Sequence, residues 1–326
     1  MTPSPDTRSV LLAGASGYIG RAVAAELGRR GHRVVSLVRP DSAVPSVLKD
    51  LTGMREARVT DPESVRRAVA GDRFDTVVSC LASRTGVGAD AWTVDHGANA
   101  NLLAAAGDAG VGHFVLLSAL CVQHPQLEFQ RAKLAFEAEL AASGLDHSIV
   151  RPTAFFKSLA GQIPRLKAGR PFVLFGDGPG PACKPISEGD LARFVADCVG
   201  QPAEHAGILP IGGPGPAVTP LERGTMLFDM LGMQPRFRRL PLAMFDAISG
   251  TLGLLSRAWP AAAAKAELAR IGRFYATEPM LQRDPDSGRY DADATPEYGA
   301  DTLADFYARA IEHGLAGQEL GDQALF

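Results

Sequence analysis

A glycine-rich turn between an apolar run and a helical pattern constrains this fold more than any other feature of the sequence. The turn is Gly14-Ala-Ser-Gly17-Tyr-Ile-Gly20, and it directly follows the apolar run Val10–Ala13. Glycines at this spacing permit a tight turn, let the backbone approach a pyrophosphate, and let the next helix pack against the strand. The free N–H groups of that helix attract an anion. The turn therefore predicts a dinucleotide site; the alternative is a glycine-rich turn that binds nothing.

Apolar runs alternate with amphipathic segments through the first half of the chain. Such runs are typical of buried parallel strands, and such segments are typical of helices packed on a sheet. We expect strands at Ser9–Ala13, Arg33–Val38, Thr76–Ser79, His113–Leu117 and Asp146–Val150, and helices at Ile19–Arg30, Pro62–Ala70, Asn99–Ala109 and Glu128–Ala142. Right-handed crossovers place such helices on both faces of the sheet. The prediction is an α/β fold with a Rossmann-type doubly wound parallel sheet.

Glycine and proline accumulate after Arg151, and the alternation weakens there. Because single cores stop growing at roughly 250 to 300 residues, the chain of 326 residues suits a large domain with an appended portion. We expect a dinucleotide-binding Rossmann domain at residues 1–155 and a smaller C-terminal substrate-binding lobe at 156–326. Some elements of this lobe are expected to return to the Rossmann sheet.

Three helices are expected in the second half, each beginning after a residue that can cap it. Ser and Thr followed by an acidic third residue form a capping box, and Asp is a good N-cap. The expected helices run from Ser187 to about Val199, from Thr219 to near Gly232, and from Asp301 to about Gly314.

Composition and charge exclude several classes of protein. The formal net charge is −3, and both signs are mixed along the chain, so there is no basic face for nucleic acid. The four cysteines and seven histidines lack the spacing that metal or iron–sulfur ligands require, so we predict no metal. The polar start, Met1–Ser9, lacks the apolar core of a secretory signal, which favours a cytoplasmic location.

The longest apolar region is Leu240–Ala266. Charged residues, glycines and a proline interrupt it, which argues against a transmembrane helix of about 20 apolar residues. Peripheral membrane contact and the number of subunits stay open at this stage.

Arg39 points to the form of the cofactor. An NAD enzyme usually carries an acidic residue near the end of the second strand, whereas an arginine there can pair with a 2′-phosphate. NADPH is therefore the expected cofactor, with Asp41 as the argument for NADH. Asp61 lies between the expected strands Arg33–Val38 and Thr76–Ser79, where it can accept a hydrogen bond from the adenine amino group or cap a helix.

Strings along almost the whole chain resemble one enzyme family. They include Val78-Ser-Cys-Leu-Ala-Ser-Arg-Thr85, Leu127-Glu-Phe-Gln-Arg-Ala-Lys-Leu134, Ala182-Cys-Lys-Pro-Ile-Ser187 and Arg270-Ile-Gly-Arg-Phe-Tyr275. The family is the NADPH-dependent divinyl chlorophyllide 8-vinyl reductases, which are atypical short-chain dehydrogenases. The resemblance implies reduction of the 8-vinyl group of 3,8-divinyl chlorophyllide a, or of divinyl protochlorophyllide a, to an ethyl group in (bacterio)chlorophyll biosynthesis. Its partner would thus be a tetrapyrrole substrate.

The motif and the resemblance together nominate the residues of the site. The cofactor-binding candidates are Gly14, Ser16, Gly17, Tyr18, Ile19, Gly20, Arg39, Asp61, Cys80, Leu81, Ala82, Ser83, Lys133, Pro152, Thr153 and Phe155. For the substrate, Phe156 is one of several aromatic residues that can form apolar walls for a flat macrocycle. Lys157 and Lys184 can pair with its propionate carboxylate; ordinary packing or exposure is the alternative for each.

Catalysis cannot follow the usual short-chain dehydrogenase pattern, in which a tyrosine lies four residues before a lysine. Here the pair is Phe129 and Lys133, and phenylalanine cannot exchange a proton. Lys133 is the main catalytic candidate, expected to hold the nicotinamide ribose and add positive charge; a solvated helix lysine is the alternative. Ser118, directly after the expected strand His113–Leu117, is either catalytic or a turn residue. Tyr18 and Cys121 are among further candidate proton donors.

Two other functions are compatible with these residues. An isoflavone-reductase-like enzyme acting on a smaller conjugated substrate also combines a glycine motif with a lone lysine. A non-catalytic NADP(H)-sensing regulator would need no tyrosine.

Overall fold

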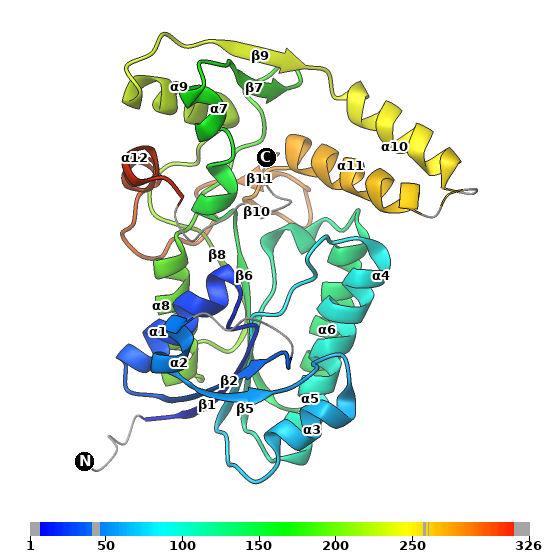
Figure 1. Cartoon of the computed structure of the whole chain (residues 1–326), viewed down its shortest axis with the longest axis vertical. Helices are drawn as coiled ribbons and strands as arrows, with labels where there is room; N and C mark the ends of the chain where they lie inside the picture. Colours follow the sequence, from blue (N-terminus) through cyan, green and yellow to red (C-terminus); the bar gives the residue numbers. More distant parts are fainter. Residues whose placement is uncertain (1–6, 41–45, 257–258, 260, 316–326) are drawn as a thin grey trace. The chain divides into compact units, whose positions relative to one another are not determined.

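The computed structural model describes residues 7–40, 46–256, 259 and 261–315. The chain forms two compact units, shown in Figure 1. The first comprises the residues up to Pro152 together with Glu188–Pro210, and the second comprises Thr153–Ser187 together with the residues from Ile211 onward. The first unit is therefore built from two separate stretches of chain.

A seven-stranded sheet has the strand order β3-β2-β1-β4-β5-β6-β8. Its strands are β1 (Ser9–Ala13), β2 (Arg33–Val38), β3 (Gly53–Glu56), β4 (Thr76–Ser79), β5 (His113–Leu117), β6 (Asp146–Pro152) and β8 (Gly207–Ile211). The pairs from β3 to β6 are all parallel, as in the register of Leu12 with Ser36 and Val78. The order reverses between β1 and β4, and ligands of such sheets bind at the carboxyl ends of the strands near that point.

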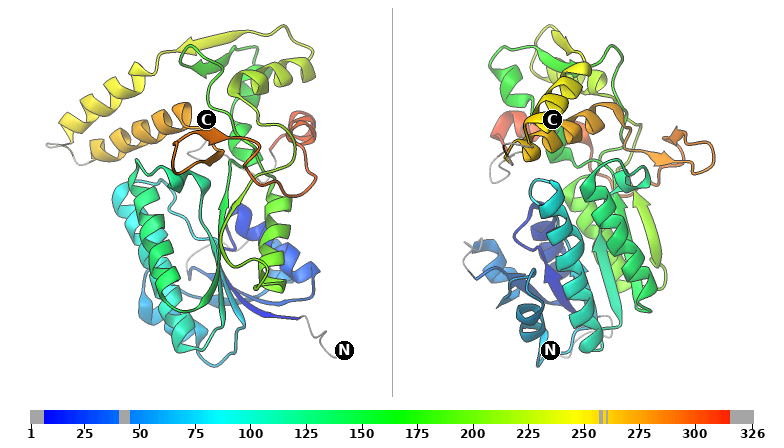
Figure 2. Two further views of the ribbon diagram at one scale, coloured as in Figure 1. Left: turned by 180° about the vertical axis from the view of Figure 1, so that it is seen from behind. Right: turned by 90° about the vertical axis from the view of Figure 1, so that its right-hand side faces the viewer.

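Helices cover both faces of this sheet. Figures 1 and 2 show α1 (Tyr18–Arg29), α2 (Ser46–Leu51) and α8 (Glu188–Gly200) on one face. The opposite face carries α3 (Pro62–Val69), α4 (Gly88–Ala91), α5 (Asn99–Asp108) and α6 (Glu128–Ala142). This arrangement confirms the predicted doubly wound Rossmann-type fold.

The predicted strands and helices of the first half are all present, with ends shifted by no more than two residues. Five elements were not predicted, namely the short helices α2 and α4, the strand β3, and the helices η1 and η2. β3 is a mostly exposed edge strand of sequence Gly-Met-Arg-Glu, so it lacks an apolar run. The π-helix η1 (Trp92–Ala98) continues α4 directly into α5, and the 3₁₀-helix η2 (Leu120–Gln123) follows β5.

An apolar core lies between the sheet and the helices α3, α5 and α6. Strand residues such as Leu11, Val77 and Phe114 pack there with the helix residues Leu102 and Phe136. All five side chains are buried. The burial of such side chains holds each strand in register, because a slip of one residue would turn its apolar set toward the other face.

The second unit has its own smaller core and two short pairs of strands. Its elements are η3 (Phe156–Leu159), α7 (Ile163–Lys167), β7 (Phe172–Phe175), α9 (Pro220–Met230), β9 (Phe237–Leu240), α10 (Ala243–Leu255), α11 (Ala261–Thr277), β10 (Gln282–Arg283), β11 (Tyr290–Asp291) and α12 (Leu303–His313). Strands β7 and β9 pair in parallel, and β10 and β11 pair antiparallel. Aromatic side chains such as Phe156, Phe228 and Tyr307 fill the core.

Two of the three helix starts in the second half follow the predicted capping residues. Helix α8 begins directly after Ser187, and Thr219 caps α9 by accepting a hydrogen bond from the Glu222 N–H. The prediction for Asp301 is wrong: Thr302 caps α12, because its hydroxyl accepts from the Asp305 N–H at 3.1 Å. Asp301 instead accepts a hydrogen bond from the Ser187 hydroxyl at 2.6 Å.

No helix within the described ranges combines the length and apolar character that crossing a bilayer requires. Across the same residues, no three side chains of the metal-binding types cluster closely enough to hold an ion.

Candidate functional site

The turn between β1 and α1 leaves no room for side chains at two of its glycines. Gly14 has φ = +83°, and a Cβ there would lie 2.6 Å from the Cys80 carbonyl oxygen. A Cβ on Gly20 would lie 2.1 Å from the Gly14 carbonyl oxygen. The turn therefore packs tightly on the end of β4, and α1 packs tightly on the turn, which only glycine permits.

Helix α1 begins with backbone donors that no side chain caps. Its N-cap is Gly17, and the neighbouring Ser16 is exposed as well. Ile19 is buried and anchors the first turn to the protein. An uncapped helix N-terminus beside a turn of glycines is a suitable site for a pyrophosphate. The residues present therefore fit a dinucleotide cofactor.

Tyr18 also lies in this turn, but its hydroxyl has a partner within the first unit. It donates a hydrogen bond to the Glu188 carboxylate at 2.5 Å. Burial, and then the Glu188 carboxylate, raise the pKa of Tyr18 far above its usual range. The Tyr18 hydroxyl is thus a very weak acid in the protein.

The two polar candidates at the adenosine side lie after β2 and β3. Arg39 is exposed, directly after the last residue of β2. Asp61 caps α3, because its Oδ1 accepts a hydrogen bond from the Glu63 N–H at 3.0 Å. The helix-cap alternative for Asp61 is therefore correct, and a contact with adenine stays a prediction. Asp41 lies outside the described residues.

The segment after β4 is held against both β1 and η1. The Cys80 N–H donates to the Ala13 carbonyl at 2.9 Å, and the Ser83 N–H donates to Asp95 Oδ2 at 3.3 Å. Leu81 packs against the core of the first unit, whereas Ala82 is exposed. Burial raises the pKa of the Cys80 thiol to about 12, so this thiol stays protonated at neutral pH.

Lys133 is a buried lysine with a buried partner. It is 9% exposed, and its Nζ lies 3.0 Å from Oδ1 of Asp95, which is 2% exposed. The contact is an ion pair outside hydrogen-bond geometry, since Oδ1 accepts no hydrogen bond among the described atoms. The alternative of a solvated helix lysine is wrong. A lysine at this degree of burial is rare unless it is paired.

The π-helix η1 places Asp95 at this point. Asn99 donates from Nδ2 to the Asp95 carbonyl oxygen at 3.0 Å, and the Ser79 hydroxyl donates to Asn99 Oδ1. A chain of polar contacts thus runs from the end of β4 through η1 to Lys133 on α6. π-Helical turns are often found at functional sites. Sequence analysis missed Asp95, because a single aspartate within a helical pattern carries no distinguishing spacing.

Ser118 belongs to a second buried network on α6. Its hydroxyl donates a short hydrogen bond to Glu137 Oε1, and Glu137 is also paired with Arg151. Ser118 and Glu137 are both buried. The Ser118 proton therefore already has an acceptor in the protein, one helical turn beyond Lys133 on α6. A catalytic role for Ser118 stays a prediction.

Phe129 lies one helical turn before Lys133 on α6 and is buried. Its ring carries no proton that could be exchanged with a substrate. The helix therefore presents a lysine without the tyrosine that would normally accompany it.

Pro152 ends β6 in the first unit, and the remaining candidates lie in the second. Thr153 donates its N–H to the Ile211 carbonyl at 2.9 Å, and its hydroxyl donates to the Lys184 carbonyl. Phe155 is half-buried and forms a backbone bridge with Ile186. The backbone around Thr153 and Phe155 is thus fixed by hydrogen bonds.

The three substrate candidates differ in how accessible they are. Phe156 is 1% exposed and packs on Phe306 with ring centroids 5.6 Å apart, so its side chain belongs to the core rather than to a surface that could contact a pigment. Lys184 is buried, and its ammonium already pairs with Glu297. Lys157 is half-buried within η3.

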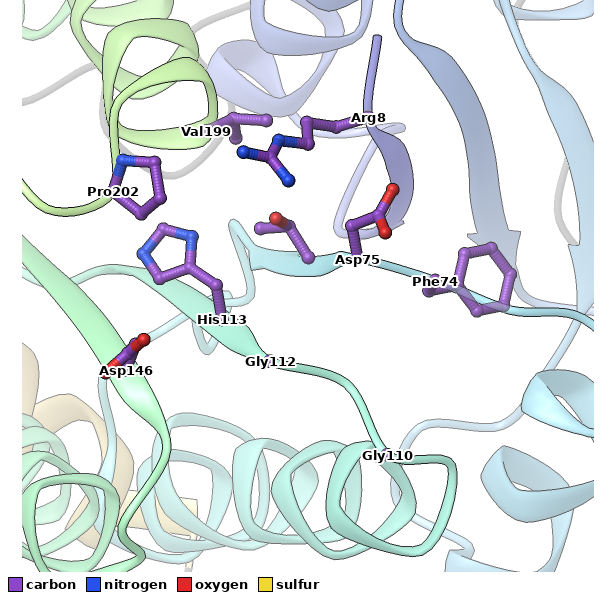
Figure 3. A pocket seen from close by; sticks show the side chains of 10 residues that line it. Arg8, Phe74, Asp75, Gly110, Gly112, His113, Asp146, Val199 and Pro202 are labelled. Atoms are coloured by element: carbon purple, nitrogen blue, oxygen red, sulfur yellow. The ribbon is translucent and has the colours of Figure 1, made fainter. Parts of the chain in front are cut away.

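A cavity of about 260 Å³ lies at the opposite, amino edge of the sheet. Figure 3 shows Arg8, Asp75, His113 and Asp146 around it, at the starts of their strands. None of the predicted site residues lines this cavity. Because parallel sheets bind ligands at their carboxyl edge, we place the dinucleotide site at the glycine-rich turn and not here.

Comparison with known proteins identifies the family of the chain and the class of its cofactor. Residues 14–202 match a family model described as NAD(P)H-binding. The chain is similar to the chloroplastic divinyl chlorophyllide a 8-vinyl-reductase of Oryza sativa subsp. indica, with 50% identity over 99% of this chain and 83% of that protein. The enzyme of the same name from Arabidopsis thaliana is 48% identical over 98% of this chain and 81% of that protein.

Solved structures share the fold at low identity. An NADPH-dependent quinone oxidoreductase from Escherichia coli, solved with NADPH, has a TM-score of 0.65 and 20% identity, covering 92% of this chain and 99% of that one. The family model confirms the prediction of a nicotinamide dinucleotide cofactor. The full-length similarity confirms the resemblance seen in the sequence strings. The chain therefore belongs to the NAD(P)H-binding family and, within it, to the divinyl chlorophyllide a 8-vinyl-reductases.

Proposed function

We propose that this protein reduces the 8-vinyl group of 3,8-divinyl chlorophyllide a to an ethyl group in (bacterio)chlorophyll biosynthesis. The observation that carries this proposal is the identity of about half the residues, over nearly the whole chain, with reductases named for that reaction. Divinyl protochlorophyllide a has the same vinyl group and belongs to the same substrate class.

The chemistry suits a site without a catalytic tyrosine. NADPH, when bound, supplies a hydride to the terminal carbon of the vinyl group, which is conjugated with the macrocycle. The ring system spreads the negative charge that results, and one proton then completes the ethyl group. A carbonyl oxygen that needs simultaneous protonation is absent, so Phe129 is no obstacle to this reaction.

Lys133 would act by its charge and its position. Its ammonium, held by Asp95 at the carboxyl edge, can hold the ribose hydroxyls of the cofactor and stabilise negative charge that develops on the substrate. Asp95 supplies the countercharge that makes a buried ammonium tolerable. The glycine-rich turn would orient the cofactor through backbone contacts to its pyrophosphate.

Arg39 supports NADPH over NADH as the reductant. It is an exposed guanidinium at the end of β2, where the adenosine ribose lies in Rossmann folds. A guanidinium can bind a 2′-phosphate with two hydrogen bonds, whereas NADH lacks that phosphate.

Two neighbouring side chains are poor proton donors for the second step. The Cys80 thiol has a pKa of about 12, and the pKa of Tyr18 is raised even further beyond neutral pH. A proton donor near neutral pH works best with a pKa close to the operating pH. We therefore assign neither residue the role of general acid.

The function is tested by anaerobic incubation of the purified protein with NADPH and 3,8-divinyl chlorophyllide a, followed by chromatography of the pigments. A product two hydrogens heavier, absent with heat-killed protein and slower with NADH, is expected. NADPH binding is measured in parallel by fluorescence. Tight binding of NADPH without any pigment product would favour the regulator, and turnover of small conjugated substrates alone would favour an isoflavone-reductase-like enzyme.

A further inference from the structure

Helices α10 and α11 form an antiparallel hairpin with large apolar side chains exposed at its closed end. Figures 1 and 2 show the two helices side by side. Leu254 is 66% exposed, Leu255 is 49% exposed and Trp259 is 62% exposed. A cluster of exposed leucine and tryptophan at one point of a surface usually marks a binding site.

Helix α10 is weakly buried along its whole length. Of its residues, only Phe245 is buried, although the helix contains five other large apolar side chains. Ile248, in the middle of the helix, is 41% exposed. Three of its six large apolar side chains, Ile248, Leu254 and Leu255, are exposed, so much of the apolar surface of the helix does not contact its own protein.

The charge of this region differs from that of the rest of the chain. Between Arg236 and Arg273 the sequence holds seven basic residues and only two acidic ones, Asp246 and Glu267. The whole chain carries a net charge of −3. This stretch therefore carries a net charge of +5. It includes β9, where Arg238 and Arg239 lie, as well as the hairpin.

We propose that the α10–α11 hairpin docks this protein on an anionic lipid bilayer, with Leu254, Leu255 and Trp259 inserted at the boundary between headgroups and acyl chains. Leucine gains free energy by entering the apolar layer, and tryptophan prefers this boundary. Basic residues near the surface of anionic lipids each add about 1 kcal/mol of attraction. No helix in the described parts of the chain can span the bilayer, so the docking is peripheral.

A second copy of the chain fits this surface less well than a bilayer does. A symmetric dimer would place the same basic region opposite itself, and like charges repel across such an interface. An anionic bilayer instead complements the charge and the apolar tip together. The proposal does not depend on the reaction, although an apolar pigment would also partition into that bilayer.

The test uses tryptophan fluorescence, because the chain has only two tryptophans. In a Trp92→Phe variant, Trp259 is the sole reporter. We expect its emission to shift to shorter wavelength on addition of vesicles made of equal parts phosphatidylcholine and phosphatidylglycerol, and to be quenched by lipids brominated on their acyl chains. Pure phosphatidylcholine vesicles should bind the protein at least about fivefold more weakly.

Variants in the tip and in the charged region separate the two contributions, measured by sedimentation with vesicles. Leu254→Ser with Leu255→Ser should lower the partition coefficient by at least about tenfold, while Ile208→Ser, at a residue 52% exposed on β8, should not. Lys265→Gln should lower it about fivefold. Arg67→Gln on α3 is the matched control for charge.

Three results would overturn the proposal. The first is failure of the protein to sediment with anionic vesicles. The second is sedimentation with an unshifted Trp259 spectrum, which would place the contact elsewhere. The third is a dimer in solution that Leu254→Ser with Leu255→Ser dissociates, which would assign the tip to a second copy. NADPH-dependent pigment reduction in detergent is measured for each variant, so a failed membrane test leaves the proposed reaction separately assessed.

Discussion

The two edges of the central sheet bury titratable side chains in opposite ways. At the carboxyl edge, Lys133 and Asp95 form a buried ion pair, and Asp95 also accepts a hydrogen bond from the Ser83 N–H in the segment after β4. At the amino edge, His113 is also buried, but burial lowers its pKa to about 4, so it stays neutral. Its Nδ1 has no hydrogen-bond partner within the described residues and faces the cavity of Figure 3.

This difference teaches that a cavity alone does not identify the site. The amino edge offers about 260 Å³ of open space, yet its buried histidine is uncharged. At the carboxyl edge, the two side chains of an ion pair are both buried, which costs solvation free energy. Such a cost is expected where a fixed charge is used in chemistry.

The largest expected effect is at Lys133. Lys133→Ala should lower kcat/KM for pigment reduction by about 10²- to 10³-fold, the usual effect of removing one electrostatic stabiliser of a transition state. The rate is measured by pigment chromatography. Lys49→Ala, at an exposed lysine on α2, is the control. Phe129→Tyr should leave activity nearly unchanged. Full activity of Lys133→Ala would show that the buried ion pair at the carboxyl edge is not used in the reaction.

Replacement of Asp95 should lower both the free energy of unfolding and the rate of pigment reduction. Asp95→Ala leaves the Lys133 ammonium buried without its partner and should lower the free energy of unfolding by about 3–5 kcal/mol. The double variant Asp95→Leu with Lys133→Met should recover most of that loss, because two apolar side chains replace the pair, and yet stay inactive. Urea unfolding and steady-state rates measure the two quantities. A double variant as unstable as Asp95→Ala would show that the pair is not the source of the effect.

His113 should contribute stability that depends on pH. Its pKa is about 4 in the folded protein and 6.5 in the unfolded chain, so the unfolded state takes up a proton first as the pH falls. The contribution is fully present above about pH 6.5 and is lost as the pH falls from about 6.5 to 4. The loss of folding free energy reaches about 2.5 kcal/mol at pH 4.5. The loss, measured by urea unfolding, should shrink in His113→Gln and not in His147→Gln. A change of kcat/KM at pH 7 in His113→Gln would contradict a purely structural amino edge.

The smallest expected effect concerns the cofactor. Arg39→Glu should reduce the preference for NADPH over NADH by at least about tenfold, since a charge-assisted hydrogen bond contributes roughly 1.5–3 kcal/mol. The ratio of kcat/KM for the two cofactors measures it. An unchanged ratio would reject the role of Arg39, and Arg21→Glu on α1 controls for a general change of charge at this edge.

The sequence predicted the first unit better than the second, for physical reasons. Buried strands such as Thr76–Ser79 are continuous apolar runs, and the turn at Gly14 carries glycines that close packing requires. The edge strand Gly53–Glu56 has no apolar run, so it could not be recognised. In the second unit, Asp301 is of a residue type that often caps helices. Its carboxylate instead accepts a hydrogen bond from the Ser187 hydroxyl, which is distant in the sequence.

The parts of the site that depend on local spacing were predicted from the sequence. The parts that depend on contacts between side chains distant in the sequence were missed. Lys133 and Phe129 could be compared from their spacing alone. Their burial, and the partner Asp95 from another helix, depend on how η1 packs against α6, which no local pattern records. Phe156, for which the sequence left a substrate wall and ordinary packing as alternatives, is a core residue, so the packing alternative is correct.

Because η1 is a π-helix, the contact between Asp95 and Lys133 depends on the number of residues in this segment. A residue removed from Trp92–Ala98 would tend to restore an α-helical turn and rotate everything before it by about 100° around the helix axis. Asp95 would then no longer face Lys133, although no side chain of the site had been replaced. Variants that keep the chain length should therefore be tolerated on the exposed side of η1, at Trp92 or Thr93, while single deletions should not.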